Sequence, residues 1–252
     1  MSNLLAFPMY AVDRADTRAL WLAVKGLLAA RGVSVDRDPG WPESDLLTHW
    51  KQPALILSQT CGYPLVTQLP DVQVVGCFHY AAPGCEGSQY RSFLVVREED
   101  GHLTLADFRG RRAVCNSADS QSGYNALRKI VTSLASGGPF FAQTSFSGSH
   151  RQSLIDVKRG AGDIAAIDCV TWALLQRHEP ERLAGLAIID HTPLTPGLPL
   201  IASPNTSPET LNAIRDALHE LVDAPEYREV RDAVLIDGFS VVTREAYASL
   251  SA

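Results

Sequence analysis

The chain has 252 residues, of which 46% are hydrophobic and 20% charged, with 18 glycines and 15 prolines. This composition is that of a soluble globular protein with one large or two medium-sized cores. A formal net charge of −6 at pH 7 and the lack of a basic stripe argue against a nucleic-acid partner or an anionic membrane, because such binding depends on clustered Lys and Arg. No apolar run approaches the length of a transmembrane helix, so we expect no membrane insertion.

Residues 1–13 lack the charged start, the long apolar core and the cleavage site of a signal peptide. We therefore expect a periplasmic protein if a signal peptide has been removed, and a cytoplasmic one otherwise. The five cysteines include no C-x-x-C pair, which predicts neither a zinc site nor a full disulfide framework. Cys77 and Cys85 are close enough in sequence to pair across a loop, but reduced thiols fit a chain without an export signal. We expect no metal and no cofactor.

The first third of the chain alternates short apolar runs with amphipathic ones, which predicts a βαβαβ order. Strands are expected at residues 4–12, 33–35, 54–57 and 72–78. Helices are expected after Asp13, which caps the first, at residues 42–50, and briefly before residue 69. This order is typical of a doubly wound α/β lobe.

A Pro/Gly-rich segment at residues 81–88 predicts a first crossing into a second lobe, and a Pro-rich segment at residues 192–199 predicts the return. Between them we expect strands at 90–97, 112–115, 144–146, 164–168 and 186–190, and helices at 123–136, 151–159 and 170–177. After the return we expect a strand at 200–203, a helix capped by Ser207 with Pro208 at its first position, and helices at 225–234 and 244–250. The predicted organisation is a discontinuous lobe 1 (residues 1–86 and 195–252) and an inserted lobe 2 (residues 87–194), with an interlobe cleft and a hinge at its base.

The segment of residues 109–134 is the strongest candidate for a binding site. A short strand runs into a polar turn that contains Ser120, Gln121, Ser122 and Gly123, and this turn opens a helix. The first amide groups of a helix lack intrahelical partners and lie at the positive end of its dipole, so they can hold an oxyanion. The alternative is that Ser120 or Ser122 only caps the helix.

Other polar residues also fall just after predicted strands, where α/β lobes present their ligand sites. They are Tyr10, Gln59, Thr60, Tyr63, His150 and Asp168. Some of these residues have a structural alternative. His150 can be a surface or capping histidine, and Asp168 a helix cap, which the sequence favours. Tyr10, Tyr63 and also Tyr90 can be core residues. If His150 lies near a bound dianion, the opposite charge favours its protonated form.

Four segments resemble the PhnD-like phosphate, phosphite and phosphonate substrate-binding proteins of ABC importers. They are L-A-D-F-R-G-R-R-A-V-C-N-S-A-D-S-Q-S-G-Y at residues 105–124, G-S-H at 148–150, D-I-A-A-I-D-C-V-T-W at 163–172 and T-P-G-L-P at 195–199. The resemblance implies a type II periplasmic-binding-protein fold, with two doubly wound α/β lobes joined by two hinge strands. It also implies a non-catalytic protein that closes on a small phosphonate-like or phosphate-like anion and passes it to an ABC permease.

By the same resemblance, Ser120, Gln121, Ser122, His150 and Asp168 are ligand residues, and Tyr90 with the turn at residues 58–63 closes over from the other lobe. The chain departs from the family at Gln121, where Thr is usual, so one hydroxyl donor is replaced by a longer amide. The alternatives are a cytosolic enzyme or a ligand sensor on the same fold, although no nucleophile and base are identifiable by spacing.

Overall fold

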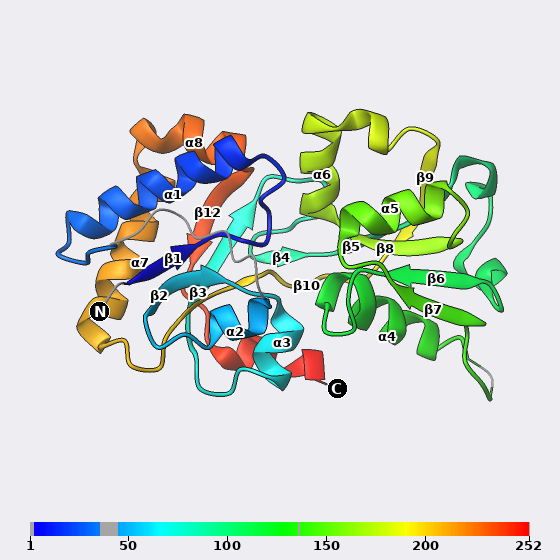
Figure 1. Cartoon of the computed structure of the whole chain (residues 1–252), viewed down its shortest axis with the longest axis horizontal. Coiled ribbons are helices and arrows are strands. Elements are labelled where there is room, and N and C mark those ends of the chain that lie inside the picture. The colour runs from blue at the N-terminus through cyan, green and yellow to red at the C-terminus, as the bar shows by residue number, and fades with distance from the viewer. Residues whose placement is uncertain (1–2, 36–44, 136, 252) are drawn as a thin grey trace. The chain divides into compact units, whose positions relative to one another are not determined.

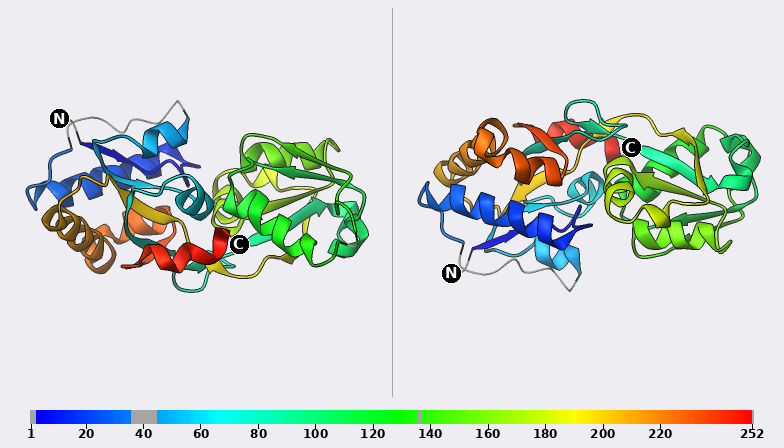
Figure 2. Two further views of the ribbon diagram at one scale, coloured as in Figure 1. Left: turned by 90° about the horizontal axis from the view of Figure 1, so that it is seen from below. Right: turned by 90° about the horizontal axis from the view of Figure 1, so that it is seen from above.

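The computed structural model describes residues 3–35, 45–135 and 137–251 (Figure 1). The chain divides into two compact units. Unit 1 comprises Met1–Ala81, Glu86–Gln89 and Pro196–Ala252, and unit 2 comprises Ala82–Cys85 and Tyr90–Thr195. Each unit contains a five-stranded sheet with helices on both of its faces (Figures 1 and 2). Among the described helices, none is both long and apolar enough to cross a membrane.

The sheet of unit 1 has the order β1-β2-β11-β3-β12 and mixes parallel with antiparallel pairs. Its strands are β1 (Leu4–Ala6), β2 (Leu55–Gln59), β3 (Gln73–Tyr80), β11 (Pro199–Ala202) and β12 (Ile236–Ser240). β1 and β2 are parallel, whereas β11 is antiparallel to both of its neighbours. One face is covered by α1 (Arg14–Ala29), α7 (Pro208–Asp223) and α8 (Arg228–Ala233), and the other by α2 (Leu46–Trp50), α3 (Gly62–Thr67) and a 3-10 helix, Arg244–Ser251.

The sheet of unit 2 has the order β7-β6-β8-β5-β9. Its strands are β5 (Ser92–Arg97), β6 (Arg112–Cys115), β7 (Gln143–Phe146), β8 (Ile164–Asp168) and β9 (Leu186–His191). β6 runs parallel to β7 and β8, and β5 runs antiparallel to β8 and β9. Its helices are α4 (Ala126–Thr132), α5 (His150–Lys158) and α6 (Cys169–His178), and short 3-10 turns cover Glu98–Asp100, Leu105–Phe108 and Pro180–Arg182. Separately, β4 (Gln89–Tyr90) pairs with β10 (Thr195–Pro196).

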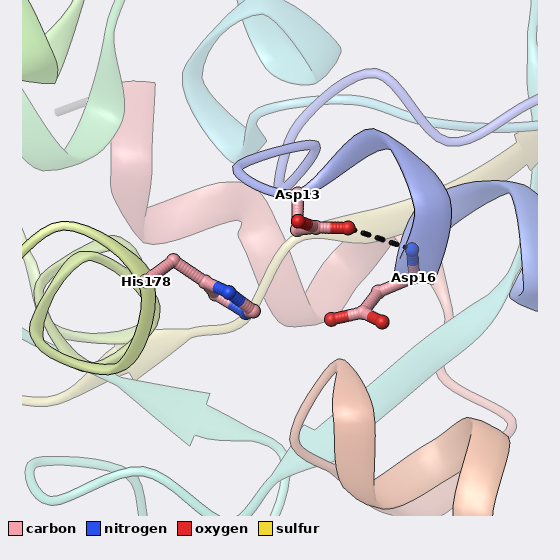
Figure 3. Close-up of side chains that lie close together, drawn as sticks. All are labelled: Asp13, Asp16 and His178. Carbon is pink, nitrogen blue, oxygen red and sulfur yellow. Dashed lines mark hydrogen bonds between the residues drawn. The ribbon is translucent and has the colours of Figure 1, made fainter.

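Local capping chemistry confirms two predicted helix starts. The side chain of Asp13 accepts a hydrogen bond of 2.9 Å from the backbone N–H of Asp16 and begins α1 (Figure 3). The side chain of Ser207 accepts one of 3.1 Å from Thr210, with Pro208 in the first turn of α7. In both helices, a side-chain oxygen satisfies an amide that has no intrahelical partner.

The predicted strand at residues 33–35 is wrong. Val33 and Val35 are buried, as the apolar pattern requires, but their backbone joins no strand. The N–H of Val33 instead donates to the carbonyl of Leu28 and so closes the end of α1. An alternating apolar pattern predicts which side chains are buried, but it does not show whether their backbone pairs with another strand.

The predicted strand at residues 4–12 is too long, because β1 ends at Ala6. Pro8 follows two residues later and has no N–H to give to a ladder. The predicted helix at 42–50 begins at Leu46 within the described residues, while residues 42–44 lie outside them. The helix predicted at 225–234 divides into a 3-10 turn, Pro225–Tyr227, and α8.

The sequence did not predict β12, because Asp237 and Gly238 within it are typical of a turn. The strand pairs with β3 through a register shift between Ile236 and Gly238. A Cβ atom at Gly238 would lie 2.8 Å from Nδ1 of His79. The glycine therefore lets β12 approach β3 closely, and it does not form a turn.

We expect Leu28→Ala to lower the free energy of unfolding by about 2–5 kcal/mol, because it leaves a cavity in a packed core. Leu28 is 0% exposed, whereas Leu22 on the same helix is 50% exposed. Leu22→Ala is therefore the matched control, with an expected change within about 0.5 kcal/mol. Urea unfolding of the two variants measures both values. Equal losses in the two variants would show that the helix does not pack as described.

Candidate functional site

Ser120 caps the helix that begins after the turn following β6. Its Oγ accepts a hydrogen bond of 3.0 Å from the N–H of Gly123, and its carbonyl accepts one of 2.9 Å from the N–H of Asn125. The second bond spans five residues, so the helix opens with one π-helical turn, Gln121–Asn125, before α4. The predicted cap is therefore present. The start of this helix is also the positive end of its dipole, which favours an anion.

Ser122 is held at both its backbone and its side chain. Its carbonyl accepts a hydrogen bond of 2.8 Å from Oγ of Ser92, the first residue of β5. Its own Oγ lies 2.9 Å from Nε2 of His150. Ser122 is 5% exposed, so these two bonds fix the turn against both the sheet and α5.

His150 reaches Ser122 because β6 and β7 are parallel and in register, with Cys115 opposite Phe146. The carboxyl ends of parallel strands meet at one edge of a sheet, so the turns that follow them are neighbours. His150 is the first residue of α5, which Ser149 caps by accepting a hydrogen bond from Gln152. Burial lowers the pKa of His150 from 6.5 to about 4. The imidazole is thus neutral at pH 7 in the structure described.

Asn116 also lies at this candidate site, although it was not among the residues predicted from the sequence. Its Oδ1 is buried and has no hydrogen-bond partner among the described residues, and the same is true of Nδ1 of His150. Its carbonyl accepts the N–H of Gly148 and ties the end of β6 to the turn before α5. A Cβ at Gly123 would lie 1.9 Å from Asn116 Oδ1, so only glycine leaves room for this side chain. The signal was available, since Asn116 directly follows a predicted strand.

Gln121 belongs to a polar chain along the helix. Its Oε1 accepts a hydrogen bond of 2.7 Å from Nδ2 of Asn125, and Asn125 Oδ1 accepts one of 2.8 Å from Arg128. The carbonyl end of the Gln121 amide is thus turned toward Asn125. Because an anion needs donors, the amide nitrogen is the end of this side chain that suits one.

Asp168 caps α6, as the sequence favoured. Its Oδ1 accepts hydrogen bonds from the N–H groups of Val170 (2.8 Å) and Thr171 (3.3 Å). It also lies opposite Ser92 in the pairing of β8 with β5. Ser92 in turn donates to Ser122, so the same strand position connects Asp168 with the polar turn. Tyr90, at the end of β4, is 3% exposed and belongs to unit 2, the unit of the Ser120–Gly123 turn, rather than to the other lobe as expected.

Unit 1 has a polar cluster of its own around Tyr80. Nε2 of Gln59 donates to the Tyr80 hydroxyl over 3.0 Å, and the ring of Tyr10 meets the Tyr80 ring edge-on at 5.0 Å between centroids. The N–H of Thr60 donates to the carbonyl of Pro199. Tyr63 lies in the first turn of α3 and its carbonyl accepts from Thr67. Gln59 and Tyr10 therefore both contact Tyr80, whereas the bonds of Thr60 and Tyr63 go to other residues.

The polar cluster of unit 2 is rich in hydroxyl and amide groups and is defined as Ser92, Asn116, Ser120, Gln121, Ser122, Gly123 and His150. At pH 7 it contains no ionised side chain, because its one titratable member, His150, is neutral. Neutral donors at a helix start bind an anion without first breaking an ion pair. The arrangement therefore suits an oxyanion better than a cation or an apolar ligand.

A model of the family described as ABC transporter, phosphonate, periplasmic substrate-binding protein matches residues 55–247, which is more than half of the chain. No curated protein sequence matches. Among solved structures, PhnD1 from Prochlorococcus marinus in complex with methylphosphonate is similar, with a TM-score of 0.79 at 16% identity, covering 99% of this chain and 96% of that one.

Two further structures are similar over 100% of this chain. A binding protein component of an ABC phosphonate transporter from Pseudomonas aeruginosa has a TM-score of 0.77 at 16% identity, with 85% of its own chain covered. XAC2383 from Xanthomonas citri bound to ATP has a TM-score of 0.76 at 14% identity, with 96% covered. These likenesses establish the type II periplasmic-binding-protein fold that the sequence predicted. Together with the family match, they show that the chain belongs to the family of periplasmic substrate-binding proteins of phosphonate ABC transporters.

Proposed function

We propose that this protein binds a small oxyanion of the phosphonate, phosphite or phosphate class at the polar cluster of unit 2, for delivery to an ABC permease. Ser120, Gln121, Ser122, Gly123 and His150 are the proposed ligand residues. The observation that carries the proposal is the Ser122–His150 pair at a helix start. Asp168, Tyr90, Tyr10, Gln59, Thr60 and Tyr63 remain predictions from the sequence, and the periplasm is the compartment that the family supports.

The neutral Ser122–His150 pair supplies a donor to an anion in either tautomer. If the proton is on Nδ1, then Nε2 accepts the Ser122 hydroxyl, and Nδ1–H is a buried donor without a partner among the described residues. If the proton is on Nε2, it donates to Ser122 Oγ and leaves the hydroxyl hydrogen for the ligand. Both states gain a hydrogen bond when an oxyanion arrives, and such bonds to charged groups contribute about 1.5–3 kcal/mol.

The same pair has the distance of a nucleophile and its base, but we propose that it does not catalyse. A serine nucleophile needs a base whose pKa is near the working pH and a third group that orients the imidazole. The pKa of His150 is about 4, and its Nδ1 meets no carboxylate in the described part of the chain. Burial also raises the pKa of the Cys115 thiol to about 12, which keeps it protonated.

Isothermal titration calorimetry with phosphate, phosphite, methylphosphonate and 2-aminoethylphosphonate tests the proposed function. We expect at least one of the four to bind, and phosphorus NMR to find it unaltered after prolonged incubation. Failure of all four to bind would overturn the ligand class. Conversion of a bound ligand would overturn the non-catalytic assignment.

Ser122→Ala should weaken the affinity for the tightest of these ligands by about 1–3 kcal/mol, because the variant lacks both the hydroxyl and its bond to His150. Ser133→Ala is the matched control: its Oγ bonds to the carbonyl of Ile130 at the exposed end of the same helix. Calorimetry should find the control unchanged. Equal affinities in both variants would leave Ser122 with a purely structural role.

The stability of the ligand-free protein should fall as the pH is lowered from about 6.5 to about 4. In this window the unfolded chain binds a proton at His150 that the folded chain does not, because burial lowers the folded pKa. The effect is at most about 1.4 kcal/mol per pH unit. His150→Asn should flatten this part of a profile measured by urea unfolding, whereas His102→Asn, which removes an exposed imidazole, should not. Parallel profiles for wild type and His150→Asn would contradict the assignment.

A further inference from the structure

Two cysteines of unit 2 that are distant in sequence meet in the structure. Sγ of Cys85 lies 3.5 Å from Sγ of Cys169, the first residue of α6. Both are free thiols in the structure described. The sequence left open a pairing of Cys85 with Cys77 and favoured reduced thiols. The structure instead places Cys77 Sγ against the backbone carbonyls of Phe78 and Ser88.

The backbone on each side of this contact is fixed by hydrogen bonds. The N–H of Cys85 donates to the carbonyl of Ala82 and closes a turn, and the N–H of Cys169 donates to the carbonyl of Arg91. Gly84, which directly precedes Cys85, has a φ of +100°, and a Cβ there would lie 2.9 Å from Cys169 Cβ. Glycine at this position therefore lets the turn approach the start of α6 closely enough for the two sulfur atoms to meet.

We propose that Cys85 and Cys169 form a redox-active pair that closes to an intrachain disulfide. The sulfur atoms need to approach from 3.5 Å to the bond length of about 2 Å, which is within the reach of small side-chain rotations. The oxidant is a low-molecular-weight disulfide or an oxidised dithiol protein. The periplasmic compartment of the family supplies such oxidants.

The reaction is two successive thiol–disulfide exchanges. Cys85, which is only partly buried, attacks one sulfur of the oxidant as thiolate, forms a mixed disulfide and releases one thiolate. The Cys169 sulfur then loses its proton to solvent and attacks Cys85 Sγ, which breaks the mixed disulfide and releases the second thiolate. Two electrons pass to the oxidant, and the protein loses two protons.

The order of attack follows from the environments of the two thiols. Cys169 is 0% exposed. The hydrogen bond with Cys85, together with burial and the nearby Asp168 carboxylate, raises the pKa of the Cys169 thiol. Cys169 therefore reacts second, after Cys85 has entered the mixed disulfide and that hydrogen bond has been lost.

The disulfide would tie the turn at Ala82–Cys85 to the first residue of α6, directly after Asp168. Closing so long a loop restricts the unfolded chain, so the oxidised protein should unfold at a higher temperature than the reduced one. The unfolding temperature would thus depend on whether the compartment oxidises or reduces this pair.

The test is incubation of the full chain with oxidised glutathione, followed by intact-mass measurement, thiol titration in denaturant and peptide mapping without reduction. In the wild type we expect a mass loss of about 2 Da, two of the five cysteines unreactive and a peptide that links Cys85 with Cys169. Cys169→Ser should stop at the mixed disulfide and retain glutathione on Cys85. Cys77→Ser is the matched control and should close as the wild type does.

Three results would overturn the proposal: a wild-type chain with all five thiols reactive, a wild-type chain with glutathione retained on Cys85, or a map that links Cys85 with Cys77. Because the peptide map is made on the wild type, the outcome does not depend on the folding of the variants. The experiment contains no phosphonate or phosphate, so it is also independent of the proposed ligand.

Discussion

Parallel pairing of β6 with β7 is the constraint on which the polar cluster of unit 2 depends. The register that sets Cys115 opposite Phe146 brings the turns after both strands to one edge of the sheet. Two backbone bonds, from Ser147 to Cys115 and from Gly148 to Asn116, then fix those turns together. Only with this edge in place do Ser122 and His150, 28 residues apart, come within 2.9 Å.

The two aspartates at the ends of β8 have different partners. Asp163, just before β8, accepts hydrogen bonds from Arg112 and Arg97. Burial alone would raise the pKa of Asp163, but these bonds hold it well below its usual range. Asp168, at the other end of β8, caps a helix. The two carboxylates of one short motif thus have different roles: an ion pair that joins strands, and a cap beside the proposed anion site.

The sequence predicted many elements well where a single local signal sufficed. β6 and β8 have the bounds that their apolar runs indicate, and α1 and α7 begin after the capping residues Asp13 and Ser207. It failed where a distant partner decided the outcome. Val33 and Val35 are buried but pair with no strand, because the N–H of Val33 bonds to the end of α1. β12 contains an Asp-Gly pair and still pairs with β3, through a register shift.

The sequence by itself determined the fold class and the Ser120–Gly123 turn, because strand periodicity, caps and a polar turn before a helix are local properties of the chain. The family followed from the resemblance of four of its segments to known binding proteins. Tertiary structure decided the rest of the cluster. The bond between Ser122 and His150, the place of Asn116 against Gly123 and the meeting of Cys85 with Cys169 all join segments distant in sequence. Such contacts depend on strand register and on burial, and the spacing of residues along one segment encodes neither of the two. Burial also lowers the pKa of His150.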